Sequence, residues 1–379
     1  MRVLIACGGT GGHINPGIAI ADMIKAKYPD AEILFAGTPN HMEAKLVPKA
    51  GYRIETIRVE GFQRKISLEN IGRNAKALRY LATSGRRAKQ IIREFKPDIA
   101  IGTGGYAAGP VIRKAAKMGI PTAIHEQNAY PGVTNRLLSK EVDHVMLTVI
   151  EALDFMDKSK FEYSVTGLPV RSSINSVTKA EARKKLGFND DFTVLSFGGS
   201  LGAGCINETM EAAIKWHVGE GLKINHIHGY GGMGKDTFPQ AMKDAGIPLK
   251  SDRLRITEYI NDMDVCLAAA DLVICRSGAS TLAELEAAGR ASILIPSPIV
   301  AGNHQYHNAM VLGKAGAAIV IEQKEASPER LISEIKKLYE EPDKAEAMSA
   351  CAKELCVADT NDRIMEVVDK LFAKSKSEK

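Results

Sequence analysis

The chain has 379 residues, of which 45% are hydrophobic and 25% are charged, and its formal net charge at pH 7 is +5. These values are typical of globular proteins, and the length favours two domains of common size. No apolar run approaches the roughly 18 residues that cross a bilayer, and no signal-peptide pattern precedes the first strand, so we expect a cytoplasmic protein. The 6 cysteines form no C-x-x-C pair and have no histidine at zinc-finger spacing, so neither a disulfide nor a metal is required.

The chain begins with an apolar strand at 3–7 that runs directly into a glycine-rich turn carrying His13. Glycines permit positive φ and a close approach of the backbone to a ligand, and a helix from Gly17 onward would present its N-terminus to an anion. We therefore predict a site for a phosphorylated ligand. The spacing is not the dinucleotide fingerprint, because a G-x-G-x-x-G frame that begins at Gly9 fails at Ile14. The alternative is an ordinary tight turn of a doubly wound sheet.

Short apolar runs alternate with helical stretches along the whole chain, which is the pattern of parallel sheets. The predicted strands are 3–7, 32–37, 54–60, 98–102, 121–126, 144–149 and 163–166, and then 193–198, 223–228, 254–260, 272–276, 291–296 and 317–321. The predicted fold class is α/β, with two doubly wound Rossmann-like domains facing across a cleft. We place the N-terminal domain at 1–166, the C-terminal domain at 167–343, and a helical tail at 344–379 that packs back towards the first domain.

Positive charge is concentrated between 63 and 94, where nine Lys and Arg residues outnumber two Glu residues. Apolar residues such as Leu68, Ile71 and Leu78 lie between the charges, as in an amphipathic surface that rests on a membrane. We therefore predict that 62–95 binds an anionic membrane surface, and the alternative is a solvated helix face. The stretch offers few aromatic residues for stacking on bases, so we expect no nucleic-acid partner.

Six blocks of sequence, taken in order, resemble the MurG-type peptidoglycan N-acetylglucosaminyltransferases. They are GGTGGH at 8–13 with Pro16, GTGGYAAGP at 102–110, HEQN at 125–128 with PGVTNR at 131–136, GGSLGA at 198–203, RSGASTLAE at 276–284 and HQYHNA at 304–309. The resemblance implies the two-domain glycosyltransferase B architecture, and a peripheral position on the cytoplasmic face of the cell membrane. In the activity that it implies, GlcNAc passes with inversion from UDP-GlcNAc to the C4 hydroxyl of MurNAc in lipid I, giving lipid II, with neither a metal nor a cofactor.

The resemblance also implies the partners and the residues that bind them. The partners are UDP-GlcNAc and the undecaprenyl-linked MurNAc-pentapeptide, and other cell-wall synthesis enzymes are candidates. The donor-binding residues are Thr10, Gly11, Gly12, Asn128, Arg171, Ser200, Ile260, Glu284, His304 and Gln305, and the acceptor-binding residues are Thr103, Gly104, Gly105 and Tyr106.

Metal-free transfer requires other groups to neutralise the leaving diphosphate. Helix N-termini and backbone N–H groups can do so, with the hydroxyl of Ser200 and the guanidinium of Arg171 as further donors. A carboxylate such as that of Glu284 can accept both ribose hydroxyls, and the alternative for Glu284 is a solvated helix position. The D-x-D triplet formed by Asp262 and Asp264 is interpreted as helix capping and not as a metal site.

The general base is predicted to be His13, because the acceptor hydroxyl needs a proton acceptor and histidine titrates closest to neutral pH. Alternatively, His13 caps the following helix or holds the turn by hydrogen bonds. His125 and Glu126 end a strand at the same side of the predicted sheet, so they are rival bases, or they only shape the acceptor pocket.

Three positions depart from the family pattern. Leu201 stands where glutamine is common, Gly204 where arginine is usual, and Leu168 where asparagine is frequent. The first departure removes one amide from the donor pocket, and none removes a candidate catalytic group. The competing functions are a glycosyltransferase that acts on another lipid such as diacylglycerol, a UDP-GlcNAc epimerase, and a sugar-nucleotide sensor without catalysis. Fold alone does not separate them.

Overall fold

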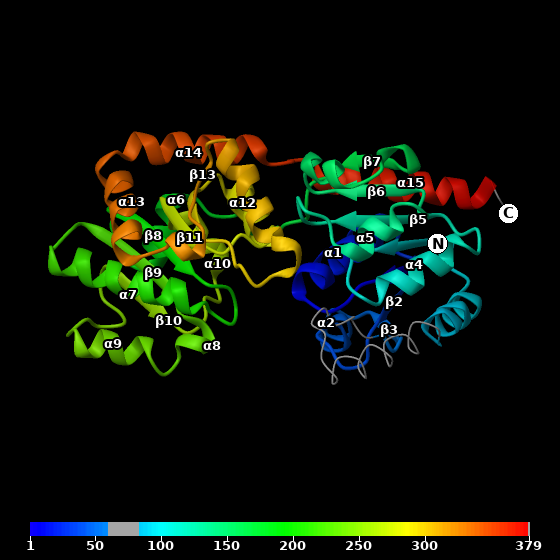
Figure 1. Ribbon diagram of the computed structural model, residues 1–379, viewed down its shortest axis with the longest axis horizontal. Coiled ribbons are helices and arrows are strands. Elements are labelled where there is room, and N and C mark those ends of the chain that lie inside the picture. The colour runs from blue at the N-terminus through cyan, green and yellow to red at the C-terminus, as the bar shows by residue number, and fades with distance from the viewer. Residues whose placement is uncertain (60–82, 378–379) are drawn as a thin grey trace. The chain divides into compact units, whose positions relative to one another are not determined.

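The chain folds into two parts, each built on one parallel sheet (Figure 1). The structure is a computed structural model that describes residues 1–59 and 83–377. One compact unit comprises Met1–Pro169 with Asp359–Lys379, and the other comprises Val170–Ala358. Helices alternate with strands in both units, so the predicted fold class of two doubly wound α/β domains is confirmed.

The first unit contains, within its described residues, a parallel sheet in the order β3-β2-β1-β4-β5-β6-β7. Its strands are β1 (Arg2–Ala6), β2 (Glu32–Gly37), β3 (Arg53–Thr56), β4 (Ile99–Gly102), β5 (Thr122–Glu126), β6 (His144–Leu147) and β7 (Glu162–Val165). Its helices are α1 (Gly11–Lys27), α2 (Glu43–Lys49), α4 (Ala108–Ala116), α5 (Val133–Leu138) and α15 (Thr360–Ser377), with short 3-10 helices at Ile150–Phe155 and Lys158–Lys160. Residues 83–95 are also helical.

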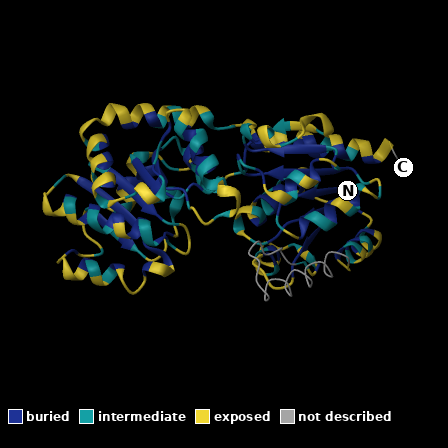
Figure 2. Ribbon diagram, viewed as in Figure 1, coloured by how far each residue is buried: buried dark blue, intermediate teal, exposed yellow. Residues whose placement is uncertain are grey.

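Helices cover both faces of this sheet. Val3 and Ile5 belong to the core under α1 and α15, whereas Leu4 and Ala6 belong to the core under α4 and the helical residues 83–95. Successive side chains of a strand point to opposite faces, so a strand covered on both sides must be apolar throughout. Figure 2 shows the result, with buried strands between helices that expose their outer sides.

The second unit contains a parallel sheet in the order β10-β9-β8-β11-β12-β13. Its strands are β8 (Phe192–Phe197), β9 (Ile224–Gly229), β10 (Leu254–Thr257), β11 (Leu272–Cys275), β12 (Ala291–Leu294) and β13 (Ala318–Val320). Its helices are α6 (Lys179–Leu186), α7 (Gly204–Gly219), α8 (Gly231–Gly234), α9 (Phe238–Asp244), α10 (Met263–Ala269), α11 (Ala279–Ala288), α12 (His304–Lys314), α13 (Pro328–Glu340) and α14 (Pro342–Leu355), with 3-10 helices at Ala301–Asn303 and Gln323–Glu325.

The tail predicted at 344–379 is divided between the units. Helix α14 packs on α11 and β12 of the second unit, where Ala345, Met348 and Ala352 are buried at helical spacing. Helix α15 instead packs on α1 and β6 of the first unit, and its buried face includes Ile364 and Val368. The apolar stripe of each helix faces the sheet that it covers. The part of the tail that packs on the first unit is therefore α15.

Both sheets reverse their strand order beside their first strand. In the first sheet the reversal lies between β1 and β4, and in the second it lies between β8 and β11. Open α/β sheets bind ligands outside the carboxyl ends of their strands at such points. The glycine-rich turns at 8–12 and 198–203 follow β1 and β8, so the fold places both of them at these positions.

Candidate functional site

His13 lies in the first turn of α1, which begins earlier than predicted. Thr10 is the extended N-cap residue, with φ −129°, and its carbonyl accepts from the backbone N–H groups of His13 and Ile14. The Nδ1 atom of His13 lies 3.1 Å from the carbonyl oxygen of Gly8. A carbonyl can only accept, so Nδ1 carries the proton and Nε2 of the neutral ring keeps its lone pair. No hydrogen bond to Nε2 is found among the described residues.

The turn that follows β4 packs directly against His13. Thr103 Oγ1 donates to the backbone carbonyl of His13 at 2.7 Å. A Cβ on Gly104, where φ is +106°, would lie 2.7 Å from His13 Cδ2, and a Cβ on Gly105 would lie 2.1 Å from Gly8 O. Glycine is therefore required at both positions. The structure thus brings His13 together with Thr103, Gly104 and Gly105, beside the half-exposed Gly11 and the exposed Thr10, Gly12 and Tyr106.

The first rival base, His125, has both ring nitrogens occupied. Its Nε2 lies 3.0 Å from Gly167 O, and the side-chain amide of Gln127 lies 3.2 Å from its Nδ1. Burial lowers the pKa of His125 to about 4, so the ring is neutral at pH 7. Its one proton is donated to Gly167, and its lone pair accepts from Gln127. This geometry fits the alternative that His125 shapes the pocket.

The second rival base, Glu126, is buried and holds the loop that follows β5. Its Oε1 accepts from the backbone N–H and the side-chain amide of Asn128, at 2.9 and 3.1 Å. Its Oε2 accepts from the N–H of Gly132 at 3.1 Å and from Asn135 Nδ2 at 2.8 Å. A carboxylate that accepts four hydrogen bonds has little capacity left for a substrate proton. The side-chain amide of Asn128, which was predicted to contact the sugar donor, donates a hydrogen bond to Glu126 within this loop.

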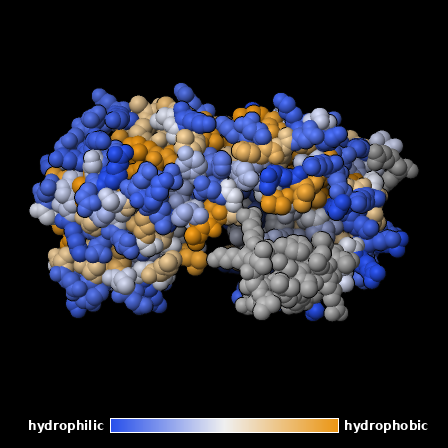
Figure 3. All heavy atoms as spheres, in the orientation of Figure 1, coloured by the Kyte–Doolittle hydropathy of each residue, from blue (hydrophilic) through white to orange (hydrophobic). Residues whose placement is uncertain are grey.

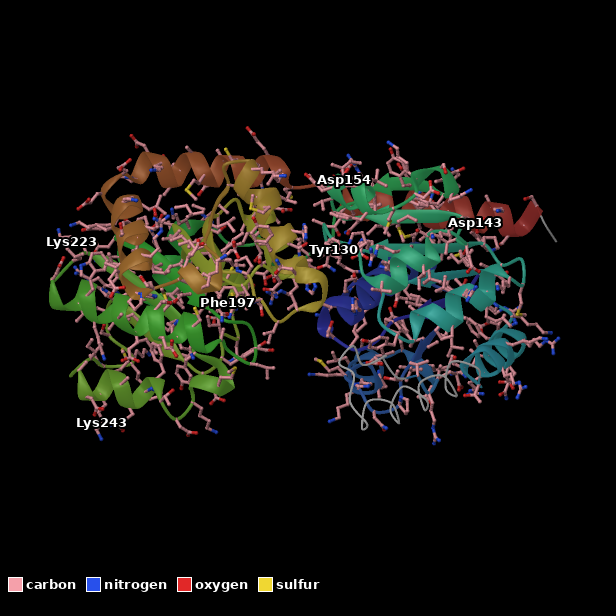
Figure 4. The ribbon with its side chains drawn as sticks, viewed as in Figure 1. Tyr130, Asp143, Asp154, Phe197, Lys223 and Lys243 are labelled. Carbon is pink, nitrogen blue, oxygen red and sulfur yellow. The ribbon has the colours of Figure 1, made fainter. Side chains whose placement is uncertain are left out.

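A pocket in the second unit collects four of the predicted donor-binding residues. It is lined by Arg171, Phe197, Gly199, Ser200, Gly229, Glu258, Tyr259, Ile260, Asn261, Met263, Thr281 and Glu284. Phe197, the last residue of β8 and one of these lining residues, is labelled in Figure 4. Gly199 and Ser200 are exposed in the turn that leads to the N-terminus of α7, so backbone N–H groups and a hydroxyl are available to an anion here.

Two of the residues that line the pocket, Arg171 and Glu284, form an ion pair. Arg171 Nε and Nη2 both lie near Glu284 Oε1, at 2.9 and 2.8 Å. Burial raises the pKa of Glu284, and the neighbouring Arg171 opposes that shift. The Glu284 side chain is 18% exposed, so it is not the solvated helix position of the alternative interpretation. Both contacts of Arg171 are to Oε1 of Glu284, so Oε2 is the atom that could accept a hydrogen bond from a ligand hydroxyl.

His304 and Gln305 begin α12 and do not line this pocket. Gln305 Oε1 accepts from the N–H of Ser297 at 2.9 Å, and its backbone carbonyl accepts from Ser277 Oγ at 2.7 Å. The Nε2 group of Gln305 is therefore the part of this amide that is left for a sugar hydroxyl. His304 is half-buried, and its Nδ1 lies 2.9 Å from Ala301 O.

The interpretation of Asp262 as a helix cap is correct in position and wrong in contact. Asp262 is the N-cap residue of α10, but its side chain makes no capping hydrogen bond. The guanidinium of Arg255 instead binds it through two contacts, at 2.8 and 2.6 Å, and this hydrogen bonding holds the pKa of Asp262 below its usual range. A bidentate guanidinium competes with the backbone for the same oxygens. Within 1–59 and 83–377, no group of three or more His, Cys, Asp or Glu residues is arranged to hold a metal ion.

One residue that positions the site, Glu43, had no signal in the sequence, and a second, Arg276, begins one of the six resembling blocks but had no predicted role. Glu43 is a buried acid at the start of α2, and its carboxylate accepts from the N–H of Gly9 at 3.0 Å. Arg276 binds the carbonyls of Ile295 and Pro296 and the amide oxygen of Gln323, and so fixes the chain after β12. In each case the partner is distant along the chain, so only the fold reveals the contact.

The comparisons with known proteins agree with this arrangement. The N-terminal domain of glycosyltransferase family 28 matches residues 3–147, and the C-terminal domain of the same family matches residues 193–364. A protein of Acetivibrio thermocellus is 46% identical over 370 residues, 97% of each chain, and one of Thermoanaerobacter sp. is 44% identical over 369 residues, 97% of this chain and 99% of the relative. Both are named "UDP-N-acetylglucosamine--N-acetylmuramyl-(pentapeptide) pyrophosphoryl-undecaprenol N-acetylglucosamine transferase".

Solved structures give the same result. The crystal structure of Acinetobacter baumannii MurG matches with a TM-score of 0.77 and 27% identity, over 97% of this chain and 99% of that one. A UDP-GlcNAc 2-epimerase from Neisseria meningitidis, bound to UDP-GlcNAc, has a TM-score of 0.65 at 12% identity over 98% of this chain and 100% of that one, so it shares the fold alone. The chain therefore belongs to the MurG-type N-acetylglucosaminyltransferases of glycosyltransferase family 28.

Proposed function

We propose that the chain transfers GlcNAc from UDP-GlcNAc to the C4 hydroxyl of MurNAc in lipid I, with inversion at the anomeric carbon and without a metal ion. The observation that carries the proposal is the similarity, over almost the whole chain, to relatives named for this transfer. The site supports it, because the second unit offers a pocket with a carboxylate, a guanidinium and free backbone N–H groups, and the first unit offers a proton acceptor.

The donor binds in the pocket of the second unit. The exposed turn at Gly199 and Ser200 and the N-terminus of α7 hold the diphosphate, since unpaired N–H groups at a helix start favour an anion. Glu284 accepts the ribose hydroxyls, and the backbone at Ile260 meets the uracil. When the diphosphate arrives, the Arg171 guanidinium has two anionic partners in reach, the Glu284 carboxylate and the phosphate.

Chemistry needs a proton acceptor, which the first unit supplies as Nε2 of His13. The C4 oxygen of the acceptor forms a bond to the anomeric carbon while the bond between that carbon and the β-phosphate oxygen breaks. The hydroxyl proton passes to Nε2 of His13, and UDP leaves with the electron pair of the broken bond. Attack from the face opposite to UDP inverts the anomeric carbon. Positive charge from Arg171 and the α7 N-terminus stabilises the leaving group in place of a metal ion.

The enzyme acts as a peripheral protein on the cytoplasmic face of the cell membrane, because its acceptor carries an undecaprenyl chain. Among the described residues, no helix is long and apolar enough to span a bilayer. Polar and charged residues cover most of the described surface in view in Figure 3. The predicted membrane-binding stretch 62–95 lies largely outside the described residues. In its described part, Arg86 and Arg93 are exposed, whereas Arg87 pairs with Glu55 at 2.6 Å.

The test is transfer of radiolabelled GlcNAc from UDP-GlcNAc to a synthetic lipid I analogue, with and without EDTA. Diacylglycerol and a reaction without acceptor serve as controls. We expect label on the lipid I analogue alone, at a rate that EDTA does not change. Label on diacylglycerol would assign the enzyme to another lipid, and donor consumption without acceptor would indicate an epimerase or a hydrolase. Loss of transfer with EDTA would contradict the metal-free mechanism.

A further inference from the structure

A buried acid reaches the glycine turn that carries His13. Glu43 is fully buried at the start of α2, and its carboxylate lies between two backbone segments. Its Oε1 accepts from the N–H of Thr38 at 2.9 Å and from the Thr38 hydroxyl, and its Oε2 accepts from the N–H of Gly9 at 3.0 Å. Both oxygens are therefore occupied, and the orientation of the carboxylate is fixed.

The surrounding backbone is shaped to admit this side chain. A Cβ on Gly37 would lie 2.6 Å from Glu43 Cγ, and a Cβ on Gly8 would lie 2.7 Å from Glu43 Oε1. Any larger residue at either position would push the carboxylate off the Gly9 N–H. Gly9 itself has φ +90°, a conformation that L side chains rarely adopt, and this conformation accompanies its hydrogen bond to Glu43.

Glu43 and His13 bind the two ends of one peptide group. The N–H of Gly9 and the C=O of Gly8 belong to the same peptide unit, and in a trans peptide they point in opposite directions. Glu43 Oε2 accepts from the N–H end at 3.0 Å, and His13 Nδ1 donates to the C=O end at 3.1 Å. The chain of contacts thus runs from the carboxylate through one peptide to the imidazole.

A negative charge at the N–H end of a peptide strengthens the hydrogen bond that its carbonyl accepts, because hydrogen bonds in series polarise one another. When the Gly8 carbonyl becomes a stronger acceptor, it holds the ring proton of His13 on Nδ1. It also stabilises the positively charged ring that forms when Nε2 takes up a second proton. In serine proteases a carboxylate does this work by direct contact with the histidine. Here one peptide group is interposed between the carboxylate and the ring.

The charges near this peptide suit such a role. Burial opposes ionisation of Glu43, but the hydrogen bonds from Thr38 and Gly9 outweigh it and hold its pKa below the usual range. Burial and the Glu43 carboxylate raise the pKa of the neighbouring Cys7 thiol to about 12. At neutral pH the acid is therefore charged and the thiol is not.

We propose that Glu43 is a positioning residue for the transfer reaction, which acts through the Gly8–Gly9 peptide to hold His13 as the Nδ1–H tautomer with Nε2 free. The proposal rests on the proposed role of His13 as the general base. It assigns Glu43 no contact with either substrate.

The test compares the full-length wild type with Glu43→Gln and Glu43→Asp. Nitrogen-15 labelling of histidine distinguishes the two ring tautomers, and a His13→Gln sample identifies the His13 signals. Glu43→Gln keeps the shape and removes the charge, whereas Glu43→Asp keeps the charge and is too short by one methylene group to reach Gly9. We expect the wild type to show His13 protonated at Nδ1 alone, and both variants to show a mixture of tautomers.

Kinetics on the same samples provide the second measurement. We expect both variants to lose about tenfold to a hundredfold in kcat, with the KM for UDP-GlcNAc within about twofold of wild type, because proton acceptance is weakened and donor binding is not. The matched control is Asp143→Asn. Asp143 accepts from the N–H and the hydroxyl of Thr122, the same pair of groups that Thr38 offers to Glu43, and it lies beside α15 in Figure 4. It should leave the His13 signals and kcat unchanged.

The outcomes separate this inference from the proposed function. If His13→Gln kept its kcat, the base assignment would fail and the role of Glu43 would fail with it. If His13→Gln lost kcat while a folded Glu43→Gln or Glu43→Asp kept the wild-type His13 signals and kcat, only the role of Glu43 would be overturned. Should Glu43→Gln not fold, Glu43→Asp decides alone, because it retains the buried charge.

Discussion

The two glycine turns follow the first strands of similar sheets, yet they are held in different ways. The turn after β1 is braced by the carboxylate of Glu43, and it leads to a histidine in the first turn of the next helix. The turn after β8 is held by main-chain contacts, since Cβ atoms on Gly202 and Gly231 would each lie 2.3 Å from the backbone of the other segment. It leaves Ser200 exposed. The first turn thus orients a side chain, and the second keeps N–H groups open to an anion.

The largest expected effect comes from removing the side chain of His13, which follows the turn after β1 and has no counterpart after β8. His13→Ala should lower kcat by about 10²–10⁴-fold, because general base catalysis contributes about that much. The affinity for UDP-GlcNAc should remain within about twofold, since the pocket proposed for the donor lies in the second unit. Steady-state kinetics and calorimetric titration of UDP-GlcNAc check both statements. A variant with weakened affinity and unchanged turnover would make His13 a binding residue.

The contact between the turns after β1 and β4 can be broken without touching His13. Gly105→Ala would place a Cβ 2.1 Å from Gly8 O at φ +84°, so it should destabilise the protein by more than about 3 kcal/mol. Gly9→Ala is the matched control, because φ is +90° there but nothing lies within 4 Å of the new atom, so only about 1–2 kcal/mol of backbone strain is expected. Urea unfolding measures both. An equal loss of unfolding free energy in the two variants would show that the turns after β1 and β4 do not touch.

A second contrast between the units concerns buried histidines. In the second unit His217, His226, Ser196 and His228 form a hydrogen-bonded chain, with contacts of 3.1, 2.9 and 2.8 Å. Burial lowers the pKa of His217 to about 4 and that of His228 to about 3, and it lowers the pKa of His226 well below its usual value. In the first unit, burial lowers the pKa of His125 to about 4 and also lowers the pKa of His144.

These shifts predict that acid weakens the second unit more than the first. Above about pH 6.5 the histidines are neutral in both states, and below it the unfolded chain takes up protons that the folded chain does not. Stability should therefore fall as pH falls from about 6.5 towards 4, by up to about 1.4 kcal/mol per pH unit for each histidine. The single tryptophan, Trp216, lies in α7 of the second unit, so its fluorescence reports this unit. A Trp216 unfolding transition that is the same at pH 7 and pH 5 would contradict the prediction.

The smallest effect is expected at the second turn. Ser200→Ala should weaken UDP-GlcNAc binding by about tenfold to a hundredfold, because a hydrogen bond to a charged group contributes about 1.5–3 kcal/mol. Turnover at saturating donor should change little, and Val218→Ala, on the exposed side of α7, serves as a control that leaves both values unchanged. Calorimetric titration gives the affinity. Unchanged binding would mean that the hydroxyl does not meet the diphosphate.

Local patterns were sufficient to predict the strands, because apolar runs mark strands that are covered on both faces. The ordered blocks include Ser200 and Glu284, and the same resemblance adds Arg171 and Ile260; the structure brings these four residues to one pocket. Their mutual contacts could not be predicted. The Arg171–Glu284 pair joins residues 113 positions apart, and no local pattern encodes such a distance.

The errors have the same physical origin. The tail predicted at 344–379 is helical, but its apolar residues, such as Ala345 and Met348 in α14, do not say which sheet their buried face covers. Asp262 stands at a helix start, where its carboxylate is expected to cap the helix, but both carboxylate oxygens instead accept hydrogen bonds from the guanidinium of Arg255. Glu43 has no motif at all, and its importance follows from a burial that only the folded chain reveals.

The central claim is that the turn after β1 serves proton transfer and the turn after β8 serves donor binding. Single-turnover transfer to the lipid I analogue tests this claim most directly. Wild type, His13→Ala and Ser200→Ala are each mixed in excess with radiolabelled donor, and the rate is followed as the enzyme concentration is raised. We predict that Ser200→Ala reaches a rate near that of wild type at saturation, whereas His13→Ala stays slow at every concentration. A slow plateau for Ser200→Ala together with a normal plateau for His13→Ala would contradict the account.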